Sequence, residues 1–112
     1  MTKFLALYMG SPNGRMSPDG LSQETMAAGM AAWGGWMAQH AGRIVDTGGP
    51  LGKTKKTSAQ GVADVRNAVT GYVILEADSH EEAAKLFEGH PHFAIFPGDS
   101  VEIMECLPIP GR

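Results

Sequence analysis

The chain has 112 residues, of which 43% are hydrophobic and 19% are charged, and its formal net charge is −3. This length fits one globular domain spanning 1–112 and excludes a second one. The weak negative charge provides no electrostatic reason to bind nucleic acid, and the basic cluster at 53–56 is predicted to be a solvated loop. A single cysteine, Cys106, excludes an internal disulfide and suits a reducing compartment. We therefore predict a cytoplasmic protein.

The first predicted element is a strand over Phe4–Met9, which is apolar on both faces. This apolar run is too short for a secretory signal or a membrane span, so no membrane association is expected. Turn residues at 10–14 end the strand in a loop that could shape the rim of a cavity. A long helix then begins at Ser17-Pro18 or at Ser22, and it ends near Ala41-Gly42.

Four apolar residues of this helix are spaced four, three and four apart, which places them on one stripe that we expect to face the sheet. They are Met26, Met30, Trp33 and Met37. Trp36 and His40 lie at the edge of the stripe, where helices often line a cleft.

Three glycines interrupt the same helix: Gly29, Gly34 and Gly35. Each costs about 1 kcal/mol relative to alanine. We therefore expect a strand, a second subunit or a ligand to approach the helix backbone closely, and tight packing against the sheet is the simplest case.

The middle of the chain is predicted to add further strands. A second strand covers Arg43–Thr47, and the turn residues at 48–50 close it. A polar loop over 51–59 follows, and a third strand lies somewhere within 57–66, where apolar and polar residues alternate. A central strand over Tyr72–Leu75 is apolar on both faces, as expected of a strand covered on two sides.

The last third of the chain begins with a capped helix. Ser79 and Glu82 have the spacing of a capping box, in which each side chain accepts a hydrogen bond from a backbone N–H at the helix start. The helix runs to about Glu88, and Gly89 is placed to end it. Pro91 then makes a corner that holds two histidines, and a final strand runs over 101–106.

We assign the chain the order β-α-β-β-α-β, which has four strands and so uses four of the five strand segments named above. The order predicts an α+β fold of the ferredoxin-like kind, with two helices covering one face of a four-stranded antiparallel sheet. The other face would still carry apolar side chains, which a soluble monomer rarely exposes. We therefore predict a homodimer in which two sheets pack face to face.

The chain resembles the YCII-related family of the dimeric α/β barrel superfamily over nearly its whole length. The most specific segments are Gly89-His90-Pro91-His92-Phe93 and Val101-Glu102-Ile103-Met104-Glu105. The resemblance implies ferredoxin-like protomers that pair into a barrel. It also implies acid–base chemistry by a histidine and an aspartate on a small aromatic or lactone-like molecule. The Asp-Gly-Pro-Phe signature of one large branch is absent, so functions specific to that branch do not transfer.

His90 and Asp46 are the candidate acid–base pair. Histidine transfers protons near neutral pH, and a carboxylate can hold its tautomer and stabilise its charged form. His90 follows a helix C-terminus, whose dipole favours the protonated ring, and Asp46 interrupts an apolar strand, where a buried carboxylate needs a partner. The same residues also fit purely structural roles, with His90 as a hydrogen-bonding group at a helix end and Asp46 as a solvated strand end.

His92, Tyr8 and Trp36 are the candidate substrate-binding residues. His92 could assist His90, and the two aromatic residues could form apolar walls with a polar tip. A metal site at the two corner histidines would need a third ligand from His40, His80 or a carboxylate, and no known metal spacing is met, so we predict neither metal nor cofactor. Cys106 is interpreted as an inert buried thiol.

Three functions remain open from the sequence. The first is a cofactor-free enzyme that carries out acid–base chemistry on a small organic molecule, which predicts that His90 and Asp46 share a cavity. The second is a non-catalytic dimeric module that binds a small molecule or a partner. The third is a haem- or metal-dependent relative, which predicts a histidine facing an open coordination site.

Overall fold

The computed structural model describes residues 1–10 and 22–110. The loop expected over 11–14 and the alternative helix start at Ser17-Pro18 lie outside these residues. The elements in chain order are β1 (Thr2–Met9), α1 (Gln23–Gln39), β2 (Ile44–Pro50), β3 (Thr54–Ser58), β4 (Gly61–Val65), β5 (Val69–Ala77), α2 (His80–Lys85), α3 (Pro91–Ala94) and β6 (Ser100–Glu105). None of the helices in the described ranges is long and apolar enough to cross a membrane.

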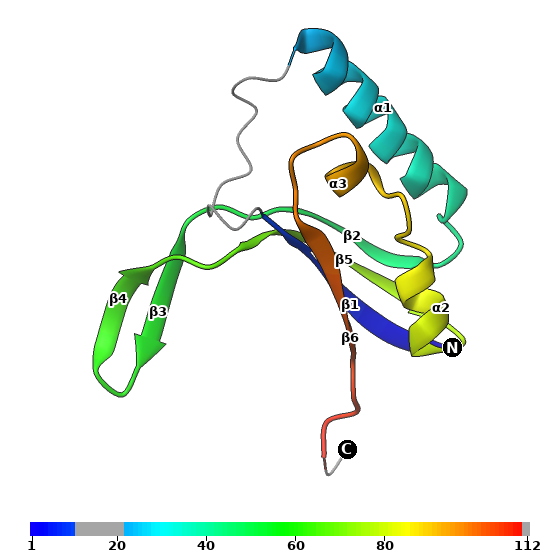
Figure 1. The fold of residues 1–112 in the computed structure, drawn as a ribbon. Helices are drawn as coiled ribbons and strands as arrows, with labels where there is room; N and C mark the ends of the chain where they lie inside the picture. Colours follow the sequence, from blue (N-terminus) through cyan, green and yellow to red (C-terminus); the bar gives the residue numbers. More distant parts are fainter. Residues whose placement is uncertain (11–21, 111–112) are drawn as a thin grey trace.

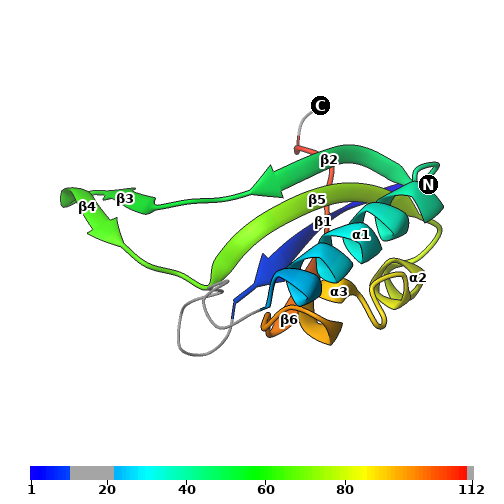
Figure 2. The same ribbon diagram turned by 90° about the horizontal axis from the view of Figure 1, so that it is seen from above.

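The predicted α+β class and four-stranded antiparallel sheet are confirmed. The strands lie in the order β2-β5-β1-β6, and every neighbouring pair is antiparallel. Figure 1 shows β1 and β5 in the middle of this sheet, and the view in Figure 2 shows all three helices on one of its faces. The two central strands therefore have one face covered by helices and one face without them.

The core lies between the helices and the two central strands. Burial alternates along β1 and β5, as expected when one face of a strand is covered. The side chains on the helix side are buried, and they include Phe4, Ala6, Tyr8, Val73 and Leu75. The alternate residues Leu5, Leu7 and Ile74 are only half-buried and lie on the helix-free face.

Residues 51–66 differ from the prediction. They were expected to form a polar loop and a third strand of the main sheet, but β3 and β4 pair only with one another. This hairpin projects from the body of the molecule (Figure 1), and nearly all of its side chains are exposed. The alternation that indicated a strand is real, but its small and polar residues cannot cover a hydrophobic core.

The second strand also continues further than predicted. It runs through the expected turn residues to Pro50. Gly48 has a φ of 62°, and a Cβ atom there would lie 1.9 Å from the carbonyl oxygen of Tyr72. The two strands can approach this closely only because Gly48 has no side chain.

The first helix begins with Ser22 as its N-cap, which was one of the two predicted starts. The Ser22 side chain accepts a hydrogen bond from the Thr25 backbone N–H at 3.0 Å. Of the three helix glycines, only Gly29 is closely approached, since a Cβ there would lie 2.4 Å from the ring of Phe96. No such contact exists at Gly34 or Gly35 among the described residues. A close approach therefore exists at Gly29, where it is made by the Phe96 side chain rather than by a strand, and approach by a ligand or a second subunit at Gly34 and Gly35 stays a prediction.

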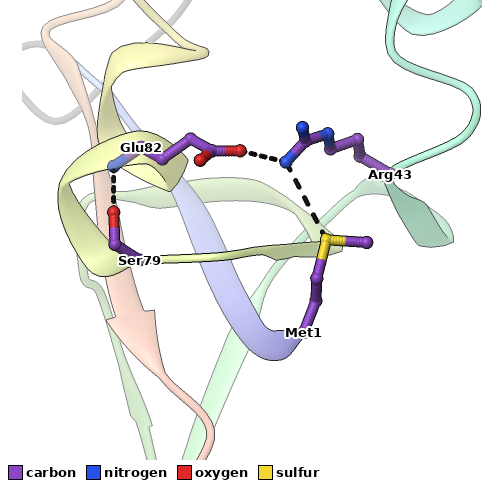
Figure 3. A network of polar contacts seen from close by, with 4 residues as sticks. All are labelled: Met1, Arg43, Ser79 and Glu82. Carbon is purple, nitrogen blue, oxygen red and sulfur yellow. Dashed lines mark hydrogen bonds and ion pairs between the residues drawn. The ribbon is translucent and has the colours of Figure 1, made fainter.

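The predicted capping box at α2 forms only in part. Ser79 accepts the hydrogen bond from the Glu82 backbone N–H, as expected. The Glu82 carboxylate, however, pairs with the guanidinium of Arg43, which also contacts the sulfur of Met1 (Figure 3). The glutamate thus joins the start of α2 to the segment that leads from α1 into β2.

The last part of the chain differs from the sequence-based prediction at α3 and at Cys106. A third helix, α3, begins at Pro91, whereas the sequence indicated only a corner there. Proline is well suited to the first position of a helix, because its missing N–H would have no partner there. Cys106 lies just beyond β6 and is exposed, so the expectation of a buried thiol is wrong.

Candidate functional site

A cavity of about 580 Å³ lies between α1 and the sheet. One wall is the predicted helix stripe of Met26, Met30, Trp33 and Met37. The stripe was expected to pack directly on the sheet, but only Trp33 and Met37 pack against the core, and Met30 is largely exposed. The stripe therefore borders an open space, and its flexible methionine side chains are suited to adapt to a bound molecule.

The opposite wall comes from the sheet and from the loop after α3. It consists of residues 47–50 of β2, residues 70–72 of β5, Tyr8 of β1, and Phe96 with Pro97. Gly34 also lines the cavity, and no heavy atom lies within 4 Å of where its Cβ would be. The lining is mostly apolar, which is typical of sites that bind small organic molecules.

Tyr8 connects this cavity to a buried histidine. Its hydroxyl lies 3.4 Å from Nε2 of His90, and the two residues are 4% and 1% exposed. Nδ1 of His90 accepts a hydrogen bond from the His92 backbone N–H at 3.0 Å, which makes His90 the N-cap of α3. Both ring nitrogens of His90 therefore have a polar partner.

Aromatic side chains surround the His90 ring. Trp33 meets it edge-on with ring centroids 4.6 Å apart, and Trp36 lies at 4.7 Å. The ring centroids of Tyr8 and Phe87 lie 5.2 Å and 5.7 Å from that of His90. The tryptophans bring α1 onto the corner before α3, so the position of His90 depends on packing between segments far apart in sequence.

Burial among these rings, together with smaller repulsive contributions from His92 and His40, lowers the pKa of His90 to about 4. The sequence had indicated the opposite, because a helix C-terminus favours a charged ring. Desolvation is the larger effect, so His90 is neutral at pH 7. Burial also raises the pKa of Tyr8, so its phenol remains protonated.

His92 lies beside this pair but does not line the cavity. It is fully buried, and its Nε2 donates a hydrogen bond to the Met9 carbonyl at 2.7 Å. Its Nδ1 has no hydrogen-bond partner among the described residues. Burial lowers the pKa of His92, and Gly98 packs so closely on its ring that a Cβ there would lie 2.4 Å away.

Asp46 is not brought to His90. It is exposed, and its Oδ1 accepts a hydrogen bond from the Gly48 backbone N–H at 2.8 Å. A regular strand would place Asp46 opposite Val73 on the helix side. The register shift after Ile44 instead pairs Asp46 with Ile74, on the helix-free face. This bulge puts the carboxylate and the histidine on opposite sides of the sheet.

The other candidate residues lie in two different environments. Tyr8 lines the cavity, as expected of a binding residue. Trp36 is buried in the core, where its Nε1 donates a hydrogen bond to the Leu86 carbonyl at 2.9 Å, and it is not part of the cavity wall. In the described ranges, no group of three or more histidine, cysteine or acidic residues is arranged to hold a metal ion.

Sequence reasoning missed several residues of the cavity wall. Trp33, the three methionines and Gly34 were recognised as features of α1 but were assigned to packing. A stripe with three methionines is itself a signal, since methionine is common at adaptable binding surfaces. Nothing in the sequence indicated that Phe96 and Pro97 close the far side.

Comparisons with known proteins show a shared fold. No protein-family model matches the chain, and no curated protein sequence matches it. A solved structure that is similar is the 5-chloro-2-hydroxyhydroquinone dehydrochlorinase of Burkholderia phenoliruptrix in complex with 2,5-dihydroxybenzoquinone. The TM-score is 0.57 at 19% sequence identity, and the match covers 94% of this chain and 93% of that chain.

Proposed function

We propose that the protein is an enzyme that binds a small, largely apolar ring compound between α1 and the sheet and acts on it by acid–base chemistry. The observation that carries this proposal is the hydrogen-bonded pair of Tyr8 and His90, one member of which lines the cavity. Tyrosine and histidine are both suited to move a proton in a site from which water is excluded. Such chemistry requires no cofactor. This pair takes the place of the pairing of His90 with Asp46 that the sequence indicated.

The volume of the cavity favours a substrate of modest size. Its volume of about 580 Å³ lies within the range of about 300–1,000 Å³ that small-molecule sites occupy. Methionine and tryptophan side chains on the α1 wall and aromatic side chains on the opposite wall favour a flat, apolar ring. A dehydrochlorinase of similar fold holds a dihydroxybenzoquinone, which is also a small flat ring but carries polar oxygen atoms.

We further propose that two ferredoxin-like protomers pair into a dimeric α/β barrel, as in the YCII-related family. The helix-free face carries the half-buried Leu5, Leu7 and Ile74 and the exposed Met104, which is a contiguous apolar surface in the register of β5, β1 and β6. A second copy of the same face would bury it symmetrically. The cavity lies on the other side of the sheet, so pairing would leave it open.

A non-catalytic binding module is the second candidate. Two observations favour it, because neither His90 nor His92 lines the cavity and because the lining is mostly apolar. In this case the Tyr8–His90 hydrogen bond would stabilise the fold, and the cavity would hold a ligand without changing it.

The binding proposal can be tested with two neighbouring glycines of α1. Gly34 lines the cavity and Gly35 does not, while both positions have free space around a Cβ. Gly34→Leu should fill part of the cavity, and Gly35→Leu is the matched control, because both substitutions raise helix propensity by about 1 kcal/mol. A panel of small ring compounds is screened by thermal shift and titration calorimetry. Compounds should stabilise the wild type and Gly35→Leu but not Gly34→Leu.

A measurement of turnover distinguishes the proposed enzyme from the non-catalytic binding module. Compounds that bind are incubated with the protein in D₂O, and exchange or rearrangement is followed by NMR. An enzyme should lose most of its turnover in Tyr8→Phe while Gly35→Leu keeps it. Binding without any reaction would support the non-catalytic module, and equal binding by Gly34→Leu would show that this cavity is not the site.

A further inference from the structure

The hydrogen bonds around His90 determine where its proton lies. A backbone N–H can only donate, so the contact from the His92 N–H makes Nδ1 of His90 an acceptor. A neutral imidazole carries one proton, which must then be on Nε2. This Nε2–H faces the Tyr8 oxygen, so His90 is the donor and Tyr8 the acceptor in the contact between them.

The direction of this hydrogen bond leaves the phenolic proton of Tyr8 unused. Within the described ranges, His90 is the only hydrogen-bond partner of the Tyr8 hydroxyl, and that contact takes up an oxygen lone pair rather than the proton. A buried hydroxyl proton without an acceptor is unfavourable, and Tyr8 is 4% exposed. Among the residues that the structure describes, this proton therefore lacks an acceptor, and Tyr8 is the member of the pair that lines the cavity.

Two other polar side chains of the cavity wall, those of Thr70 and Tyr72, are differently placed. Thr70 donates its hydroxyl proton to the Tyr8 carbonyl at 2.9 Å. Tyr72 alternates along β5 with the buried Gly71 and Val73, so its side chain extends toward the helix-free face. Tyr8 is therefore the buried phenol at this site.

We propose that the cavity selects ring compounds that carry a carbonyl oxygen, such as cyclic ketones and lactones, and that the Tyr8 hydroxyl donates a hydrogen bond to this oxygen. His90 acts as a positioning residue, because its Nε2–H orients the phenol with the proton directed away from the imidazole. This inference rests on the proposed binding function, and it names the class of ligand and the group that recognises it.

The test compares indanone with indane, which share a ring system and differ in the carbonyl oxygen. Dissociation constants are measured by ligand-observed NMR for the wild type, for Tyr8→Phe and for the control Ser58→Ala, which removes a hydroxyl from the exposed hairpin outside the cavity. One hydrogen bond should make indanone bind about tenfold more tightly than indane. Tyr8→Phe should reduce this ratio to about one without weakening the binding of indane, and Ser58→Ala should preserve the ratio.

A second measurement examines His90 itself. Long-range ¹⁵N–¹H NMR spectra of the imidazole should show the proton on Nε2 in the wild type. His90→Asn keeps an oxygen that can cap α3 but lacks the Nε2–H, so the preference for indanone should fall while indane still binds.

The outcomes separate this inference from the function on which it rests. Equal affinity for indanone and indane in the wild type would overturn the carbonyl preference and leave the binding function intact. A proton on Nδ1 of His90 would overturn the role of the imidazole. Absence of binding by both compounds would contradict the inference and the proposed pocket together.

Discussion

The hydroxyl of Tyr8 lies 3.4 Å from Nε2 of His90, although 82 positions separate the two residues in the chain. Tyr8 lies on a central strand that lines the cavity, and His90 caps the short helix α3 at the other end of the protein's sequence. The contact thus links the cavity wall to a buried, neutral imidazole. The following predictions test this pair and the packing that holds it.

The stability of the protein should decrease in mild acid because His90 is buried in its neutral form. Its pKa is lowered from 6.5 to about 4, so the unfolded chain binds the proton more readily between these values. The free energy of unfolding should be constant above pH 6.5 and should fall by about 3 kcal/mol as the pH falls to 4. Urea denaturation at several pH values measures this decrease.

The variant His90→Asn provides the control for that experiment. Asparagine can accept the capping hydrogen bond at the start of α3 but does not titrate. The decrease with pH should be shallower in the variant, and the remaining slope should include His92, whose pKa is also lowered by burial. Parallel curves for the wild type and the variant would show that His90 does not titrate as described.

Two alanine substitutions in α1 should have opposite effects. Gly29→Ala places a Cβ 2.4 Å from the ring of Phe96, whereas Gly35→Ala meets no atom within 4 Å. Gly35→Ala should stabilise the protein by about 0.5–1 kcal/mol through helix propensity. Gly29→Ala should destabilise it by about 1–3 kcal/mol, because Phe96 must move. Thermal denaturation of both variants provides the comparison, and a stabilised Gly29→Ala would mean that Phe96 does not pack there.

The ion pair between Arg43 and Glu82 should contribute measurably to stability. Both side chains are about one-third exposed, at 36% and 34%, and the pair joins two segments distant in sequence. A double-mutant cycle with Arg43→Ala and Glu82→Gln should give a coupling energy of about 0.5–1 kcal/mol that decreases with salt. The more exposed pair of Glu81 and Lys85 is the control, for which about 0.3 kcal/mol is expected. Equal coupling in the two pairs would contradict this prediction.

The proposed homodimer should dissociate when a charge is placed on the helix-free face. Sedimentation of the wild type should give about twice the single-chain mass of 11.8 kDa. Leu7→Lys should give the single-chain mass, because a twofold axis would bring two buried lysines into one interface. Phe93→Lys, on the helix α3, is the control and should remain dimeric. A monomeric wild type would remove the dimer and the barrel from the proposal.

Secondary structure could be predicted from the sequence where the local patterns that indicate strands and helix caps are strongest. The alternating and apolar patterns around Leu7, Val73 and Ile103 correspond to β1, β5 and β6, and Ser22 and Ser79 cap helices as expected. These features depend on neighbouring residues, so a short window of sequence contains the necessary information. The hairpin of β3 and β4 was misassigned because a two-residue alternation indicates a strand without indicating which strand it pairs with.

The candidate site was only partly predictable for the same reason. Tyr8, His90 and His92 were identified from residue type and local setting, and the structure buries all three. The pairing of His90 with Asp46 depended on the face of β2 from which the aspartate extends. A one-residue register shift decides that face, and it depends on hydrogen bonding to β5 rather than on the sequence of β2 alone.

The sequence by itself determined an α+β protein with a four-stranded antiparallel sheet and a histidine-bearing corner near its end. Only the tertiary structure decided that the imidazole of His90 meets the phenol of Tyr8 and that the methionine stripe of α1 borders a cavity. The physical reason is that hydrophobic periodicity and capping act over a few residues. The partner of a buried polar group is set by how distant strands and helices pack, which involves the whole chain at once.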